Sequence, residues 1–101
     1  MRPGTWAVAF LADWCPFCRR FAPEFARLAG HGFHLAMADV SSEESPLWER
    51  FSIEVIPTVV LFRNGNSVFR ADGRYMEALD SNDLAEISAA AATAGTAAGK
   101  L

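Results

Sequence analysis

The two cysteines of the chain, Cys15 and Cys18, stand three positions apart. Cysteines at this spacing carry either thiol–disulfide exchange or half of a metal site. A bond between them would close a very short loop and would therefore stabilise the fold little. Two cysteines are also too few for the disulfide framework of a small secreted domain. The pair therefore needs a chemical explanation more than a structural one.

The residues around the pair favour redox chemistry. An almost continuous apolar run, Thr5 to Ala12, ends shortly before Cys15, and a helical pattern begins at Cys15 itself. A helix N-terminus offers free N–H groups and partial positive charge, and both favour a thiolate. Cys18 lies one turn further in, on the inward side. We expect Cys15 to be the more exposed thiol and the nucleophile, and Cys18 to resolve the mixed disulfide.

A zinc site is the alternative chemistry for the pair. With His31 and His34, the two cysteines come near the spacing of a two-Cys, two-His zinc finger. The gap between the histidines is shorter than that motif uses, and His34 falls in a strand pattern. We therefore expect no metal and no cofactor, and we interpret both histidines as structural or exposed.

The elements that must position the cysteines follow from the hydrophobic pattern. Ser45 and Pro46 predict the start of a short helix, and Asn64 with Gly65 predicts a hairpin turn. Pro23 is expected to kink the helix that begins at the cysteines. The pattern predicts strands over 5–12, 33–40, 58–63 and 67–71, and helices over 15–29, 46–51 and from about 81 to 92.

This β-α-β-α-β-β-α order predicts an α/β fold with a four-stranded mixed sheet. The first two strands should be parallel, the hairpin should add two antiparallel strands, and helices should cover both faces. Asp80 or Ser81 is the expected cap of the last helix, with Leu84 and Ile87 facing inward. We expect one domain over 1–92 and a flexible, alanine-rich tail over 93–101.

Composition restricts the partners. The 101 residues are 51% hydrophobic with a net charge of −3, which suits one globular domain and gives no basic surface for nucleic acid. No apolar run reaches the roughly 18 residues that a membrane span needs. The start of the chain lacks the pattern of a signal peptide, so the cytoplasm is the expected compartment. A periplasmic or secreted location is the alternative if a leader has been removed.

Taken together, these motifs resemble the thioredoxin family over roughly residues 6 to 73. The resemblance rests on Trp-Cys-Pro-Phe-Cys at 14–18, on Pro23 five residues later, and on Phe-Ser-Ile-Glu-Val-Ile-Pro-Thr at 51–58. The last run is similar to the family's aromatic-Gly-Ile-x-x-Ile-Pro-Thr. The resemblance implies a thioredoxin-like three-layer sandwich and a protein-disulfide oxidoreductase with a Cys15–Cys18 redox centre.

The resemblance also implies the substrate-binding residues. Pro57 should be a cis-proline beside Cys15, and the backbone of Ile56 should meet an extended substrate segment. Trp14 is interpreted as a lid beside the site. The expected groove consists of Trp14, Pro16, Phe17, Ile56, Pro57 and Thr58. The implied partners are protein disulfides and a reductase or oxidase that recharges the pair. A binding or adaptor module with little turnover is the alternative function.

The chain departs from the family pattern at several points. Ala9 stands where the family has a buried aspartate that helps to deprotonate the resolving cysteine. Pro16-Phe17 replaces Gly-Pro, as in glutaredoxins. The family's first strand and helix are missing, so a bare sheet edge should leave the chain a monomer or a weak dimer. About four extra residues fall within 74–79. Asp13 is expected to cap the helix, or else to tune Cys15.

Overall fold

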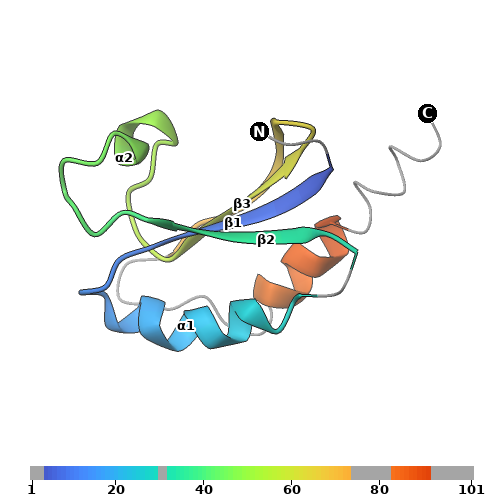
Figure 1. The fold of residues 1–101 in the computed structure, drawn as a ribbon, viewed down its shortest axis with the longest axis horizontal. Coiled ribbons are helices and arrows are strands. Elements are labelled where there is room, and N and C mark those ends of the chain that lie inside the picture. The colour runs from blue at the N-terminus through green and yellow to red at the C-terminus, as the bar shows by residue number, and fades with distance from the viewer. Residues whose placement is uncertain (1–3, 30–31, 74–82, 92–101) are drawn as a thin grey trace.

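The computed structural model describes residues 4–29, 32–73 and 83–91. Its centre is a four-stranded mixed sheet with the order β2-β1-β3-β4 (Figure 1). The strand bounds are Thr5–Leu11 for β1, His34–Asp39 for β2, Thr58–Arg63 for β3 and Asn66–Ala71 for β4. β1 is parallel to β2 and antiparallel to β3, and β4 is antiparallel to β3. The predicted mixed sheet is therefore confirmed.

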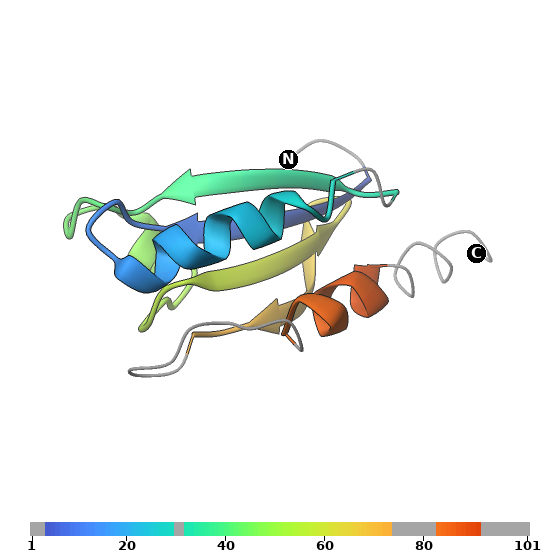
Figure 2. The same cartoon turned by 90° about the horizontal axis from the view of Figure 1, so that it is seen from below.

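Helices lie on both faces of this sheet. α1 (Pro16–Ala26) and the helical segment 83–91 lie on one face, and the short α2 (Leu47–Arg50) lies on the other (Figures 1 and 2). This arrangement is the expected three-layer α/β sandwich. No helix among the described residues is long and apolar enough to cross a bilayer.

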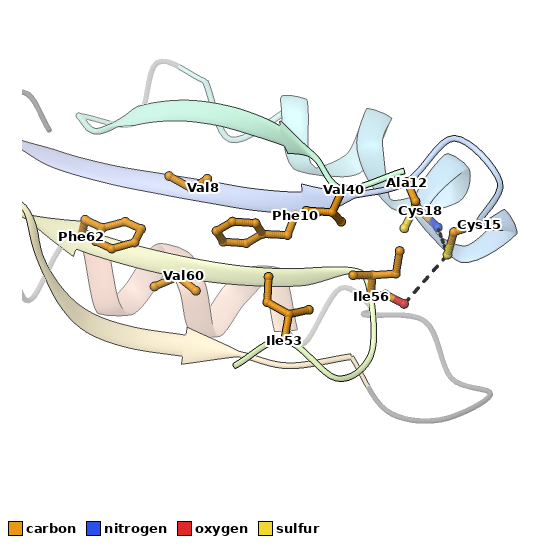
Figure 3. Close-up of a cluster of buried hydrophobic side chains, with 10 residues drawn as sticks. All are labelled: Val8, Phe10, Ala12, Cys15, Cys18, Val40, Ile53, Ile56, Val60 and Phe62. Atoms are coloured by element: carbon orange, nitrogen blue, oxygen red, sulfur yellow. Dashed lines mark hydrogen bonds between the residues drawn. The ribbon is translucent and has the colours of Figure 1, made fainter. Parts of the chain in front are cut away.

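The hydrophobic core is divided by the sheet into two clusters. β1 is buried on both faces, which explains its nearly continuous apolar sequence. Ala7 and Ala9 face the α1 side, where Phe21 and Phe25 are buried, together with Ile87 of the last helical segment. The opposite face of the sheet carries the cluster of Figure 3, which includes Val8, Phe10, Val60 and Phe62 and extends past the end of β1 to the two cysteines.

Both ends of α1 and the start of α2 differ from the predicted bounds. Cys15 precedes α1 as its N-cap, and the helix ends at Ala26 instead of Ala29 because the next N–H groups bond to carbonyls three residues back. Pro46 is likewise the N-cap of α2 and not its first residue. The Ser45 hydroxyl nevertheless accepts the Leu47 N–H at 3.3 Å, so the predicted capping bond is present.

β2 is an edge strand of the sheet, as expected from the sequence. No described strand pairs with its outer side, and Met37 on this strand is 51% exposed. At the C-terminal end, Ile87 is fully buried and Leu84 packs against the same cluster, as predicted. Asp80, Ser81, the extra residues 74–79 and the tail 93–101 lie outside the described residues.

Candidate active site

Cys15 is placed by the turn that joins β1 to α1. Its N–H donates to the Ala12 carbonyl at 3.3 Å, and its backbone is still extended, which makes it the N-cap residue of α1. Its Sγ accepts the N–H of Cys18 at 3.4 Å. Pro16 occupies the first turn, where no N–H is needed. The prediction that Asp13 caps the helix is therefore wrong, because the Cys15 sulfur occupies that role.

Both cysteines are free thiols and both are buried. Cys15 is 5% exposed and Cys18 is 2% exposed, so Cys15 is slightly the more exposed of the two thiols, as expected, but it is less accessible than predicted. The loop before β3 accounts for this burial, because the Ile56 carbonyl oxygen lies 3.9 Å from Cys15 Sγ (Figure 3). The two sulfurs share one apolar cluster with Ile56.

The loop that carries Ile56 is tightly fixed. The Ile56–Pro57 peptide bond is cis, and Pro57 is fully buried. The Thr58 hydroxyl donates to the Val55 carbonyl at 2.6 Å, and it accepts the Gly73 N–H at 3.5 Å. Thr58 is also fully buried, so its side chain holds this loop in place and does not face the surface.

The other expected groove residues lie around the turn. Trp14 is 51% exposed, and its indole N–H donates to the Ser41 carbonyl at 2.7 Å. Pro16 is exposed, and the half-buried Phe17 packs against the cluster that holds the cysteines. An exposed apolar surface therefore borders the buried pair on the α1 side, while Ile56 and Pro57 border it on the β3 side.

Ser41 is a residue of the site that sequence reasoning missed. Its hydroxyl accepts the Asp13 N–H at 2.8 Å and donates to the Asp39 carboxylate, while its carbonyl accepts the Trp14 indole. The bonds that the Asp39 carboxylate accepts from the Ser41 hydroxyl and the Ser41 N–H lower the pKa of Asp39. Ser41 thus connects the segment after β2 to the segment before Cys15. A serine two residues after Asp39 is an ordinary turn pattern, so the sequence signal was weak.

The zinc alternative does not match this geometry. His34 stacks on Trp6 with ring centroids 4.7 Å apart, at the start of β1. The other end of β1, which precedes the cysteines, lies about 16 Å from Trp6 along the strand. Within the described ranges no group of three or more His, Cys, Asp or Glu side chains could hold a metal ion. His31 lies outside those ranges.

Comparison with known proteins decides the family. The family model described as Thioredoxin matches residues 3–88. The chain belongs to the thioredoxin family. It is 35% identical to a thioredoxin of Chlamydia pneumoniae over 71 residues, which cover 69% of this chain and 70% of the relative. The Fasciola hepatica thioredoxin structure has a TM-score of 0.73 and 27% identity, with 89% of this chain and 83% of that chain covered.

The same domain also occurs inside larger relatives. The chain is 37% identical over 65 residues to a protein disulfide-isomerase of Oryctolagus cuniculus, and 34% identical over 83 residues to that of Gallus gallus. These matches cover 59% and 76% of this chain, but only 13% and 16% of the two isomerases. Both groups of relatives support thiol–disulfide oxidoreductase chemistry for this thioredoxin domain.

Against the thioredoxin pattern, the environment of Cys18 is unusual. Ala9, at the position of the family's buried aspartate, is fully buried in the cluster on the α1 side. Burial, together with the neighbouring Cys15 sulfur, raises the pKa of Cys18 to about 12. The Cys18 thiol is therefore protonated at neutral pH, and position 9 carries no carboxylate that could accept its proton.

Proposed function

We propose that the chain is a thiol–disulfide oxidoreductase that acts on protein disulfides through Cys15 and Cys18. The observation that carries the proposal is the contact between Cys15 and Cys18 at the start of α1. Cys15 Sγ accepts the Cys18 N–H at 3.4 Å, and this bond strengthens when the sulfur is a thiolate. The Cys15 thiolate attacks a substrate disulfide, and Cys18 then attacks Cys15 and releases the reduced substrate.

The loop of Ile56 and Pro57 is the proposed docking site for the substrate backbone. The Ile56 carbonyl lies 3.9 Å from Cys15 Sγ, where an extended peptide on this loop would present its disulfide to the nucleophile. Trp14, Pro16 and Phe17 supply apolar surface on the other side of the pair. Thr58 supports the loop from inside, through its bond to the Val55 carbonyl.

The electrons for repeated turnover must come from a recharging partner. A structurally similar thioredoxin f2 was solved in complex with ferredoxin:thioredoxin reductase; at 22% identity this likeness supports the fold alone. We propose a reductase as the partner and a reduction potential between about −270 and −200 mV. The cytoplasm is the proposed compartment, supported by the absence of a disulfide framework. Equilibration with glutathione buffers measures the potential, and a value far above this range would make the protein an oxidant.

The experiment that tests the function is catalysed reduction of a protein disulfide with dithiothreitol as electron donor. Wild type is expected to accelerate the reaction, Cys15→Ser to be inactive, and Cys18→Ser to accumulate a mixed disulfide through Cys15. A matched control is Ser67→Ala, which alters an exposed residue of β4. A Cys15→Ser protein with the wild-type rate would refute the nucleophile assignment.

A second candidate function is an adaptor that holds its partners with little turnover. The high pKa of Cys18 favours it, because a slow resolving step lengthens the life of the mixed disulfide. In that case wild type and Cys18→Ser would capture a disulfide-containing peptide equally well. Rapid release by wild type, with capture confined to Cys18→Ser, would exclude the adaptor.

A further inference from the structure

The resolving step of the proposed function needs a group that takes the proton of Cys18. This thiol is 2% exposed, and its pKa is raised to about 12 by burial and by Cys15. At neutral pH its thiolate is therefore rare, although the thiolate is the attacking species. The family position for a proton acceptor holds Ala9. If Cys15 and Cys18 act as proposed above, another group of this chain must accept the Cys18 proton.

A cavity of about 230 Å³, open to solvent, lies beside Cys18. Its walls are the end of β1 and the turn that follows, the N-terminal part of α1, and the C-terminal half of the edge strand β2. Its charged lining residues are Asp13, Asp39 and Arg19. Since a liquid water occupies about 30 Å³, the cavity has room for several waters between the thiol and these groups.

The two carboxylates on this cavity differ in how they are bound. Asp39 accepts the Ser41 N–H at 2.9 Å and the Ser41 hydroxyl, and these bonds lower its pKa and make it a weak base. No hydrogen bond or ion pair to the Asp13 carboxylate is found within the described ranges. Of the two, Asp13 is the carboxylate with free acceptor capacity.

The backbone of Asp13 is fixed from both sides. Its N–H donates to the Ser41 hydroxyl at 2.8 Å, and its carbonyl accepts two bonds from the Arg19 guanidinium, at 3.1 Å and 2.9 Å. Arg19 directly follows Cys18 on α1 and lines the same cavity. A residue with a fixed backbone, and with a carboxylate that no other described residue binds, thus lines the same cavity as Cys18.

We propose that Asp13, acting through water in this cavity, accepts the proton of Cys18 during resolution. In this step the S–H bond of Cys18 breaks, and its proton passes through water to the Asp13 carboxylate. The electron pair left on Cys18 Sγ forms the bond to Cys15 Sγ. The bond between Cys15 and the substrate sulfur breaks, and the substrate leaves as a thiolate. That thiolate is protonated from solvent while Asp13 returns its proton.

The sign of the effect separates this role from simple electrostatics. A carboxylate near a thiol disfavours the thiolate, because the two negative charges repel each other. If Asp13 acted only through its charge, Asp13→Asn would therefore make the resolving step faster. If Asp13 accepts the proton, the same substitution makes that step slower.

The test is the stopped-flow reaction of the reduced protein with excess Ellman's reagent. Attack by Cys15 releases the first aromatic thiolate at a rate proportional to reagent concentration. Attack by Cys18 on the resulting mixed disulfide releases the second at a rate independent of that concentration. The leaving thiolate is a weak base, so the second phase reports the deprotonation and attack of Cys18.

We expect Asp13→Asn to slow the second phase at least about tenfold at neutral pH and to leave the first phase nearly unchanged. The deficit should shrink as pH rises, because hydroxide replaces the carboxylate, and added acetate should partly restore the rate. Asp13→Glu keeps a carboxylate and should retain most of the rate. Asp39→Asn is the matched control on the same cavity; because it removes only a nearby negative charge, its second phase should be as fast as that of wild type or faster.

Three results would overturn the assignment. An unchanged or faster second phase in Asp13→Asn would leave Asp13 with no role as a base. A slower phase in Asp39→Asn in place of Asp13→Asn would move the role to Asp39. Equal slowing of both phases in Asp13→Asn would indicate a structural effect. The proposed function itself fails in a different way, because wild type would then release no concentration-independent second equivalent.

Discussion

Gly73 is buried against the loop that carries Ile56 and Pro57, and it has no room for a side chain. A Cβ at this position would lie 2.6 Å from the Pro57 carbonyl oxygen and 3.2 Å from the Ile56 carbonyl carbon. Carbon and oxygen atoms in close contact lie about 3.3 Å apart or more. Gly73→Ala therefore requires the loop to move by about 0.7 Å.

The cost of this movement follows from what the substitution touches. Overpacking typically costs about 1–3 kcal/mol, and we expect about 2–3 kcal/mol here because the neighbouring atoms are backbone. The same loop places the Ile56 carbonyl 3.9 Å from Cys15 Sγ, so the movement also disturbs the proposed docking site. A misplacement of about 1 Å at such a site costs up to 100-fold, and we expect at least a tenfold loss of activity.

Gly65→Ala is the matched control for this prediction. Gly65 has a φ of +88° in the hairpin turn, and an added Cβ meets nothing within 4 Å. The left-handed backbone alone makes this substitution cost about 1–2 kcal/mol. Stability should therefore fall in both variants, whereas only Gly73→Ala should lose activity.

Urea unfolding measures the two free energies, and catalysed reduction of a protein disulfide measures the activities at a temperature where both variants are folded. Full activity of Gly73→Ala, or a stability loss below about 0.5 kcal/mol, would show that the loop adapts without cost. An equal activity loss in Gly65→Ala would show that activity follows stability and not the position of the loop.

Three further predictions concern the core, the resolving thiol and the turn before α1. Phe21→Ala should cost about 3–5 kcal/mol in urea unfolding, because the ring is 2% exposed and packs against Phe25; a loss near zero would contradict that packing. Since the pKa of Cys18 is raised from 9.0 to about 12, the folded state binds this proton more tightly, so its stability contribution is complete below pH 9 and is lost as pH rises toward 12. Urea unfolding of reduced wild type at increasing pH should show this loss, and that of Cys18→Ala should not. The same pH dependence of stability in both proteins would refute the raised pKa of Cys18. Trp14→Phe removes the indole bond to the Ser41 carbonyl, which should cost about 0.5–1.5 kcal/mol and raise KM more than it lowers kcat; a change in kcat alone would argue against substrate contact.

The sheet could be predicted from the sequence because its signals are local and strong. The apolar run of β1 indicates burial on both faces, and Asn64 with Gly65 marks the hairpin between β3 and β4. The end of α1 was less predictable. From Arg27 onward the backbone N–H groups bond to carbonyls three residues back instead of four, and no residue type in that segment marks the change.

The site was predictable where one short motif carries the chemistry, and less so where distant segments meet. The spacing of Cys15 and Cys18 indicated a redox pair and a helix start, and the family pattern pointed to Pro57. The contact of Ser41 with Asp13 joins residues 28 positions apart, which no local pattern specifies. Asp13 was expected to cap α1 because aspartate is a common N-cap, but the Cys15 sulfur is two residues closer to the helix.

The N-cap bond from the Cys18 N–H to the Cys15 sulfur links the first turn of α1 to the chemical state of that sulfur. Most N-cap side chains accept through an oxygen that takes part in no reaction, whereas the accepting power of this sulfur depends on its chemical state. A thiolate accepts the bond strongly, and a sulfur joined to a substrate accepts it weakly. The hydrogen-exchange rate of one backbone amide should therefore rise when the protein captures a substrate and fall again on release. The reaction of the Cys15 sulfur can thus be followed through the exchange rate of the Cys18 amide, without any reagent that reacts with the thiols.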